Sequence, residues 1–221
     1  MVTVLSGVNR GRRWIVGSAT TTSSWVGNYE KDHADALEKL IRPGMTVYDV
    51  GANVGFYTLA LSRLVGDSGR VYSFEPEARN SYMLQRHIAL NQIRNVTVVQ
   101  AAVGSSRCIV GFAGADERGR IAKGAPYRIP CITLDEFVAD GNPLPDFFKM
   151  DIEGAEADAL SAANRVLEKH PKIMLATHGT EVRNECLKIL TGYGYHFAGM
   201  DFVSAPGEDL IATVEQPNAR R

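Results

Sequence analysis

Residues 47–75, VYDVGANVGFYTLALSRLVGDSGRVYSFE, predict a strand, a glycine turn, a helix and a second strand that ends in an acid. A short apolar run around Asp49 predicts the first strand, and residues 56–64 have the apolar spacing of a helix. The second strand covers residues 71–74 and stops at Glu75. In a parallel sheet crossed in this way, the turn and the acid lie side by side at the carboxyl ends of the strands, where open α/β sheets bind ligands.

The turn differs from the G-x-G-x-x-G dinucleotide fingerprint, because Asn53 and Phe56 replace its second and third glycines. Asp49, just before the turn, would repel a pyrophosphate and attract an ammonium group. The carboxylate of Glu75 can accept hydrogen bonds from two ribose hydroxyls. A ligand with a ribose and a cationic amino-acid tail fits these residues, which therefore indicate S-adenosylmethionine. An ordinary tight turn with a solvated acid would explain the glycines but not their coincidence with a strand and Glu75.

Three segments resemble one protein family: DVGANVGFYT at residues 49–58, FEPEARN at residues 74–80 and KMDIEGAE at residues 149–156. Together they resemble the FkbM family of S-adenosylmethionine-dependent methyltransferases, over roughly residues 25–178. The first motif by itself is typical of class I methyltransferases in general, and KMDIEGAE narrows the resemblance to this family. The resemblance implies the seven-stranded methyltransferase sheet and a preference for methylating oxygen.

Composition is that of an ordinary globular protein, with 45% hydrophobic and 22% charged residues in 221. We expect one domain over residues 1–221, with an N-terminal cap at residues 1–44 and a Rossmann-like core at residues 45–215. The net charge of −1 provides no basic face for nucleic acid. Without an 18-residue apolar run, a signal peptide or a cysteine framework, the chain is expected to be cytoplasmic, with free thiols and no membrane contact. A homodimer is left open.

Alternating strand and helix patterns predict an α/β fold of class I methyltransferase type. It is a doubly wound, mostly parallel seven-stranded sheet in three αβα layers, with an antiparallel closing hairpin at residues 195–198 and 210–214. Residues 1–25 are expected to form strand fragments or a cap over the ligand site. Residues 104–126, with five glycines, are expected to be irregular, and residues 155–167 to form one helix.

Residues expected to hold the cofactor come from the glycine turn and the helix after it, from the ends of three strands, and from the entry segment before the first strand. Thr58 could instead be a packing hydroxyl, and the entry pair could lie on a helix surface. The full set is Asp49, Gly51, Asn53, Gly55, Tyr57, Thr58, Glu75, Pro76, Ala102, Asp151, Tyr29 and Glu30.

Candidate catalytic residues follow the fourth and fifth strands. Asp151 ends the fourth strand, and Glu153 and Glu156 follow it, where acids can cap a helix, bind the acceptor or hold a divalent cation. Because no additional acid can be placed beside them, no metal site is predicted. His178 ends the fifth strand and could act as a general base, or be a loop histidine bonded to backbone.

The predicted activity is therefore methyl transfer from S-adenosylmethionine to a hydroxyl of a small molecule or sugar-containing metabolite, where the resemblance carries the choice of oxygen. N-methylation of a protein or other amine is one alternative, although MDIE stands where nucleobase amine methyltransferases carry an N/DPPY-like tetrapeptide. A non-catalytic S-adenosylmethionine-binding module is another. A nicotinamide oxidoreductase is disfavoured by the non-glycine residues in the turn.

Overall fold

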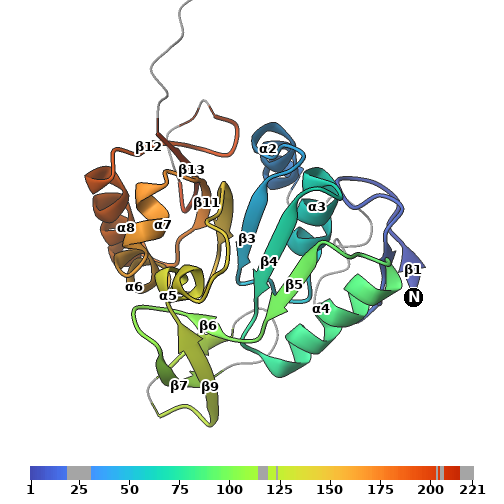
Figure 1. Ribbon diagram of the computed structural model, residues 1–221, viewed down its shortest axis with the longest axis horizontal. Helices are drawn as coiled ribbons and strands as arrows, with labels where there is room; N and C mark the ends of the chain where they lie inside the picture. The colour runs from blue at the N-terminus through green and yellow to red at the C-terminus, as the bar shows by residue number, and fades with distance from the viewer. Residues whose placement is uncertain (19–30, 114–118, 123, 203, 205–206, 215–221) are drawn as a thin grey trace, which may run out of the picture.

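A computed structural model describes residues 1–18, 31–113, 119–122, 124–202, 204 and 207–214 of the chain. Its centre is a seven-stranded sheet in the order β12-β13-β11-β10-β3-β4-β5 (Figure 1). The five strands from β11 to β5 in this order are parallel, and β13 is antiparallel to both of its neighbours, which confirms the predicted fold. The strands are β3 (Thr46–Val50), β4 (Arg70–Phe74), β5 (Val96–Val99), β10 (Phe147–Met150), β11 (Lys172–Ala176), β12 (His196–Ala198) and β13 (Asp209–Thr213).

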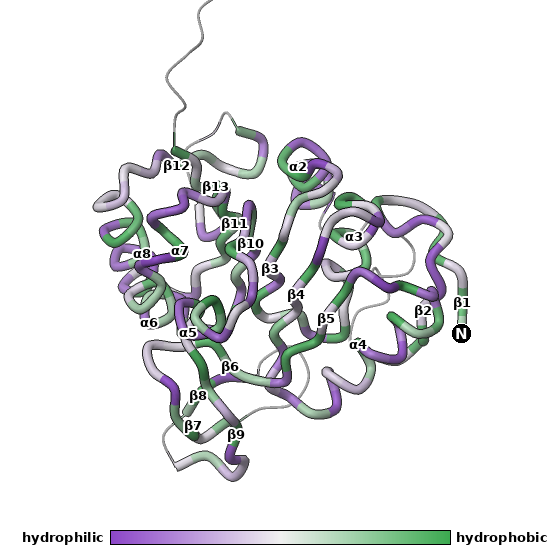
Figure 2. The backbone as a smooth tube through the Cα atoms, viewed as in Figure 1, coloured by the Kyte–Doolittle hydropathy of each residue, from purple (hydrophilic) through white to green (hydrophobic). Residues whose placement is uncertain are grey.

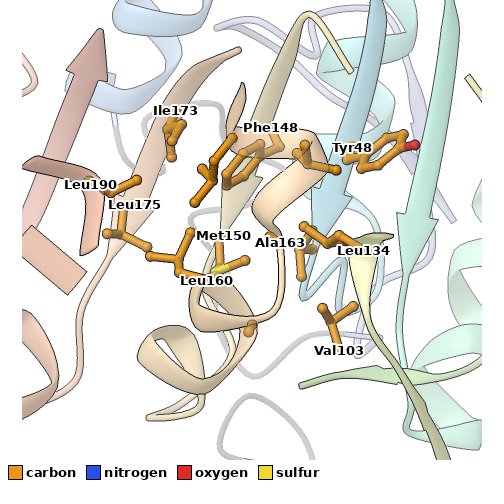
Figure 3. Packing of buried hydrophobic residues seen from close by; sticks show 14 of the residues in the cluster. Tyr48, Val103, Leu134, Phe148, Met150, Leu160, Ala163, Ile173, Leu175 and Leu190 are labelled. Carbon is orange, nitrogen blue, oxygen red and sulfur yellow. The ribbon is translucent and has the colours of Figure 1, made fainter. Parts of the chain in front are cut away.

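Helices cover both faces of the sheet, because alternate strand residues point to opposite sides. Val47 and Phe147 join the cluster beneath α2 (Lys31–Leu40) and α3 (Phe56–Val65), while Tyr48 and Phe148 join the opposite cluster (Figure 3). In Figure 2 the helices alternate between hydrophilic and hydrophobic stretches, as expected for helices that bury one face. The remaining helices are α4 (Ala78–Leu90), α5 (Leu134–Ala139), α6 (Glu156–Ser161), α7 (Asn164–Glu168) and α8 (Thr180–Gly192). Among the described helices, none is long and apolar enough to cross a membrane.

The strand order reverses between β3 and β10. From β3 the chain continues to β4 on one side, whereas β10 and β11 are added on the other. Such a switch point leaves a crevice outside the carboxyl ends of the two central strands, because their connections leave in opposite directions. The fold thus brings the glycine turn after β3 next to the acids after β10.

The expectation of irregular structure at residues 104–126 is wrong at residues 108–113 and 120–121, while residues 114–118 and 123 lie outside the described part of the chain. β7 (Cys108–Ala113) and β8 (Arg120–Ile121) form a second sheet with β6 (Ala102–Val103) and β9 (Tyr127–Ile132), in the order β6-β9-β7-β8 (Figure 1). Three of the described glycines, Gly104, Gly111 and Gly119, allow close packing: a Cβ on Gly111 would lie 2.5 Å from the carbonyl oxygen of Ala122.

The single helix expected at residues 155–167 is also wrong, because the chain forms α6 and α7 with a break between them. The carboxylate of Asp135, on α5, accepts hydrogen bonds from the backbone N–H groups of Arg165 and Val166 at 2.9 and 3.0 Å. This tertiary capping satisfies the first turn of α7, which would otherwise have unpaired donors. By contrast, α5 is capped locally, by a reciprocal capping box between Thr133 and Glu136.

Candidate active site

A cavity of about 380 Å³ opens at the carboxyl ends of the central strands. Its walls are the glycine turn, the ends of β4, β10 and β11, and residues of the second sheet. Its volume lies within the range of about 300–1,000 Å³ typical of small-molecule sites. The glycine turn, Glu75 and the acids after β10, which are separate in the sequence, therefore surround one cavity.

The glycine turn does not offer its backbone to an anion, because the N–H groups of residues 51–55 all donate within the protein. The acceptors are the carbonyl oxygen of Phe74 for Gly51 and Ala52, Glu75 for Asn53, the Asn53 side chain for Val54 and the Ala52 carbonyl for Gly55, at 2.5–3.0 Å. A pyrophosphate bound at such a turn relies on unpaired N–H groups. The turn is therefore built for a ligand without a pyrophosphate.

Glu75 is held in place at the edge of the cavity. Its two carboxylate oxygens accept hydrogen bonds from the backbone N–H groups of Asn53 at 2.7 Å and Glu77 at 2.9 Å. Burial raises the pKa of Glu75 to about 7, although both hydrogen bonds oppose the rise. Each carboxylate oxygen retains a second lone pair for a ribose hydroxyl.

Asp49 lies beneath the cavity wall and is not among the residues that line it. It is fully buried, and its Oδ2 accepts a hydrogen bond from Thr58 at 2.6 Å. Burial raises the pKa of this carboxyl group. The sequence places Asp49 against the ligand ammonium; in the structure Asp49 lies behind the cavity wall, and Asp151 is the acid that lines the cavity.

Asp151, Glu153 and His178 meet on one wall of the cavity. His178 Nε2 lies 3.7 Å from an oxygen of Asp151 and 3.6 Å from an oxygen of Glu153. On the other side of the ring, Nδ1 lies 2.9 Å from Oε1 of Glu156, which is fully buried. The hydrogen bond to Glu156 is the main cause that raises the pKa of His178 to about 9, so the ring is an imidazolium at neutral pH.

Glu156 also has a second task. Its carboxylate accepts hydrogen bonds from the backbone N–H groups of Ile152 and Gly154, both at 3.1 Å. The buried glutamate therefore shapes the loop after β10 and orients the histidine.

Asp151, Glu153 and His178 place ligating atoms within 4.8 Å of one another. An imidazolium between carboxylates accounts for this spacing without an ion.

Most residues expected to hold the cofactor line the cavity. They are Gly51, Asn53, Tyr57, Glu75, Pro76, Ala102 and Asp151, and the catalytic candidates Glu153 and His178 line it as well. Asp49, Gly55 and Thr58 lie behind the wall rather than on it. Tyr29 and Glu30 fall outside the described residues, so the expectation for them stays a prediction.

Residues 49–197, more than half of the chain, match the model of the methyltransferase FkbM domain. The chain belongs to the FkbM methyltransferase family. Its cofactor is S-adenosylmethionine, as predicted from the turn and Glu75. It is therefore an S-adenosylmethionine-dependent methyltransferase, which confirms the predicted enzyme class.

Sequence similarity to other methyltransferases is limited to short segments, whereas structural similarity extends over most of the chain. The chain is 35% identical over 69 residues to the catalytic subunit TRM61 of the tRNA (adenine(58)-N(1))-methyltransferase of Yarrowia lipolytica, a match to 31% of this chain and 18% of that protein. It is 36% identical over 59 residues to the protein-L-isoaspartate O-methyltransferase of Methanothrix thermoacetophila, a match to 27% and 28% of the two chains. The chain thus spans under a third of either relative.

Among solved structures, Aeropyrum pernix fibrillarin with natively bound S-adenosyl-L-methionine has a TM-score of 0.52 and 16% identity. The likeness covers 79% of this chain and 68% of fibrillarin. At this identity the comparison concerns the fold alone, and it agrees with the seven-stranded sheet of this FkbM methyltransferase.

Several residues of the FkbM site were not predicted. Trp14, on β2 (Arg13–Trp14), lines the cavity and stacks on His87 with ring centroids 4.1 Å apart. The two-stranded ribbon of β1 (Val2–Thr3) and β2 thus agrees with the strand fragments expected near the ligand. The buried His87 receives the N–H of Ile15 at Nε2, while its Nδ1 lies 2.7 Å from the carbonyl oxygen of Val54. It therefore ties the N-terminal ribbon to the glycine turn.

Two further residues that were not predicted are charged. Asp209 lines the cavity beside His33, whose Nε2 lies 3.4 Å from it, and this contact lowers the pKa of Asp209. Lys149 lines the cavity from the middle of a strand whose four residues are all buried. A lysine within the apolar run FFKM is unusual, because lysine is rarely buried without a partner. This anomaly is the sequence signal that could have pointed to a role for Lys149.

The titration of Glu75 should control cofactor affinity. An ionised carboxylate can accept a hydrogen bond from each of two ribose hydroxyls, whereas the protonated form loses acceptor capacity. Since the pKa of Glu75 is about 7, we expect S-adenosylhomocysteine to bind about tenfold more weakly at pH 6 than at pH 8. Calorimetric titration across this range measures the change. The Glu75→Gln variant should bind weakly with little pH dependence, and an unchanged pH profile in that variant would assign the titration to another group.

Proposed function

We propose that this FkbM methyltransferase transfers a methyl group from S-adenosylmethionine to a hydroxyl of a small molecule or sugar-containing metabolite. The observation that carries the proposal is the pair His178–Glu156, with the imidazole on the cavity wall and the buried carboxylate behind it. A hydroxyl must lose its proton as it is methylated, and an imidazole oriented by a carboxylate is suited to removing it.

When bound, the cofactor supplies a methyl group on an electrophilic sulfonium. The residues of the chain then bind, orient and move a proton. Glu75 fixes the ribose at one end of the cavity, and the acids after β10 line the other end. Nε2 of the neutral His178 removes the acceptor proton, and Nδ1–H donates to Glu156 throughout. Asp151 and Glu153, each within 4 Å of Nε2, stabilise the imidazolium that forms.

A second hollow supports a route for the acceptor. It measures about 260 Å³ and shares Ile121, Glu153 and Ala155 with the cofactor cavity, so the two spaces adjoin. Among the described residues that line it are the hydroxyls of Ser105 and Ser106 and the carboxylates of Glu153 and Asp158, with no lysine or arginine. Such walls suit a neutral molecule with several hydroxyl groups rather than a phosphorylated one.

We place the enzyme in a reducing compartment such as the cytoplasm. The support is that its three cysteines are free, including Cys108 and Cys131, which face each other across β7 and β9. Thiols so close together favour a compartment in which disulfides do not persist.

The test is methyl transfer from methyl-labelled S-adenosylmethionine. Purified enzyme is offered matched acceptors that differ only in carrying a hydroxyl or an amine, including polyols, glycosides, phenols and amino sugars. We expect label on oxygen, and mass spectrometry with fragmentation locates it. Label on nitrogen would overturn the choice of acceptor atom. Cofactor binding without transfer to any acceptor, and without slow hydrolysis of the cofactor, would favour a non-catalytic module.

A further inference from the structure

Lys149 is a buried cation in the cofactor cavity. It pairs in register with Asp49 on the neighbouring strand, so both side chains point to the face of the sheet that α3 covers. Its side chain is 6% exposed, and Nζ donates to the carbonyl oxygen of Gly51 at 2.9 Å. Nζ also lies 3.4 Å from Asp151 and 5.1 Å from the ring centroid of Tyr57. An ammonium fixed at the switch point of the sheet therefore faces the space in which the cofactor binds.

The charges of the cofactor do not match a wall made of acids alone. S-adenosylmethionine carries a sulfonium, an α-ammonium and an α-carboxylate. The two cationic groups have several carboxylates to approach, among them Asp151, Glu153 and Asp209. The α-carboxylate needs a donor with positive charge or unpaired N–H groups, because burying an unpaired charge is costly.

Few groups of the described cavity can take that carboxylate. The N–H groups of residues 51–55 already donate within the protein. Lys149 and His178 are the cationic side chains among the described residues that line the cavity. His178 lies within 4 Å of three carboxylates, whereas Lys149 lies within 4 Å of two, those of Asp49 and Asp151. The first turn of α3 is the remaining rival, because its cap residue Gly55 provides no side-chain hydrogen bond.

We infer that Lys149 forms the subsite for the α-carboxylate of the cofactor, with Asp151 beside it for the α-ammonium. Both charges of the amino-acid tail are thus bound at one place, between the ends of β3 and β10. Lys149 is thus a binding residue for the tail and a positioning residue for methyl transfer, because it fixes the chain that ends in the sulfonium.

The experiment compares two stable thioether ligands that differ by one carboxylate, S-adenosylhomocysteine and its decarboxylated analogue S-adenosyl-3-thiopropylamine. Calorimetric titration of the wild-type protein should show that the carboxylate tightens binding by about 10- to 100-fold, as for a charge-assisted hydrogen bond. In Lys149→Met the two ligands should bind within about threefold of each other. A purely structural lysine would weaken both ligands equally and leave the ratio unchanged, which would overturn the inference.

Two control variants define the result. Lys172→Met makes the same change at the amino end of β11, away from the cavity at the carboxyl ends of the strands, and should keep the wild-type ratio. Lys149→Met leaves the buried Asp49, whose Oδ1 lies 3.9 Å from Nζ of Lys149, without its cation, so this variant can fail to fold. The double variant Asp49→Asn/Lys149→Met removes both charges of the pair and should again lose the discrimination. A ratio that persists in either Lys149 variant would assign the carboxylate to the first turn of α3.

The inference depends on the cofactor and not on the acceptor. Binding of neither ligand to the wild-type protein would count against the cofactor site itself. Binding of both with equal affinity to the wild-type protein would reject the carboxylate subsite alone. Failure of the hydroxyl acceptor leaves this measurement unaffected.

Discussion

Replacing Gly51 by alanine is expected to lower the free energy of unfolding by about 3 kcal/mol or more and to abolish cofactor binding. A Cβ at this position would lie 1.9 Å from the backbone carbonyl oxygen of Asp151. That oxygen cannot withdraw easily, because the N–H of Asp151 is bonded to the carbonyl of Val50 at 3.0 Å. Gly51 also has φ of +84°, a left-handed conformation that costs alanine about 1–2 kcal/mol.

The matched control separates the clash from the backbone conformation. Gly141 has φ of +95°, with nothing within 4 Å of a Cβ built on it. Gly141→Ala should therefore cost only about 1–2 kcal/mol and leave cofactor affinity unchanged. Urea unfolding at equilibrium gives both free energies, and calorimetry gives the affinities. Equal losses of stability in the two variants would show that the close approach of the turn to β10 is not what requires glycine.

Gly51 illustrates what could be predicted from the sequence. The turn, its strand and the acid Glu75 lie within residues 47–75, so that hydrophobic periodicity and turn chemistry describe them locally. The parallel sheet followed from the same alternation. The cofactor was predicted from Asn53 and Phe56, which depart from the dinucleotide pattern, together with Asp49 and Glu75. The hydrogen-bonded N–H groups of the turn agree with the first pair, whereas Asp49 lies behind the cavity wall.

What could not be predicted depends on pairing between distant segments. Glu156 and His178 are 22 positions apart and meet because β10 and β11 are neighbours. The sequence suggested a capping role for Glu156, whereas the structure adds contact with the imidazole. The strands β7 and β8 were missed because the glycines of residues 104–126 were read as signs of irregularity, whereas Gly111 and Gly119 allow close packing. Asp49 was placed at the correct strand end, but which face of the strand meets the cavity is a tertiary property.

Replacing His178 by glutamine is expected to lower kcat by about 10²- to 10⁴-fold and to leave the affinity for S-adenosylhomocysteine within a few-fold of wild type. The reason is that the imidazole removes the acceptor proton, and glutamine has a similar length but cannot accept a proton at accessible pH. Glutamine can still donate a hydrogen bond to Glu156. Steady-state kinetics with an acceptor that the wild-type enzyme methylates measure the change in kcat, and calorimetry measures the affinity. His196→Gln, at an exposed position of β12, is the control and should keep full activity.

The pH profile distinguishes a base from a residue that only shapes the cavity. Because the pKa of His178 is about 9, roughly one molecule in a hundred has the neutral ring at pH 7, so kcat/KM should rise about tenfold per pH unit towards pH 9. The hydrogen bond from His178 to Glu156 is the main cause of the raised pKa, and it acts by favouring the imidazolium. Glu156→Gln should therefore move the rise of the profile to lower pH, with a smaller maximum rate because the ring is held less firmly. An unchanged profile in Glu156→Gln, or a rising profile that survives in His178→Gln, would show that another group takes the proton.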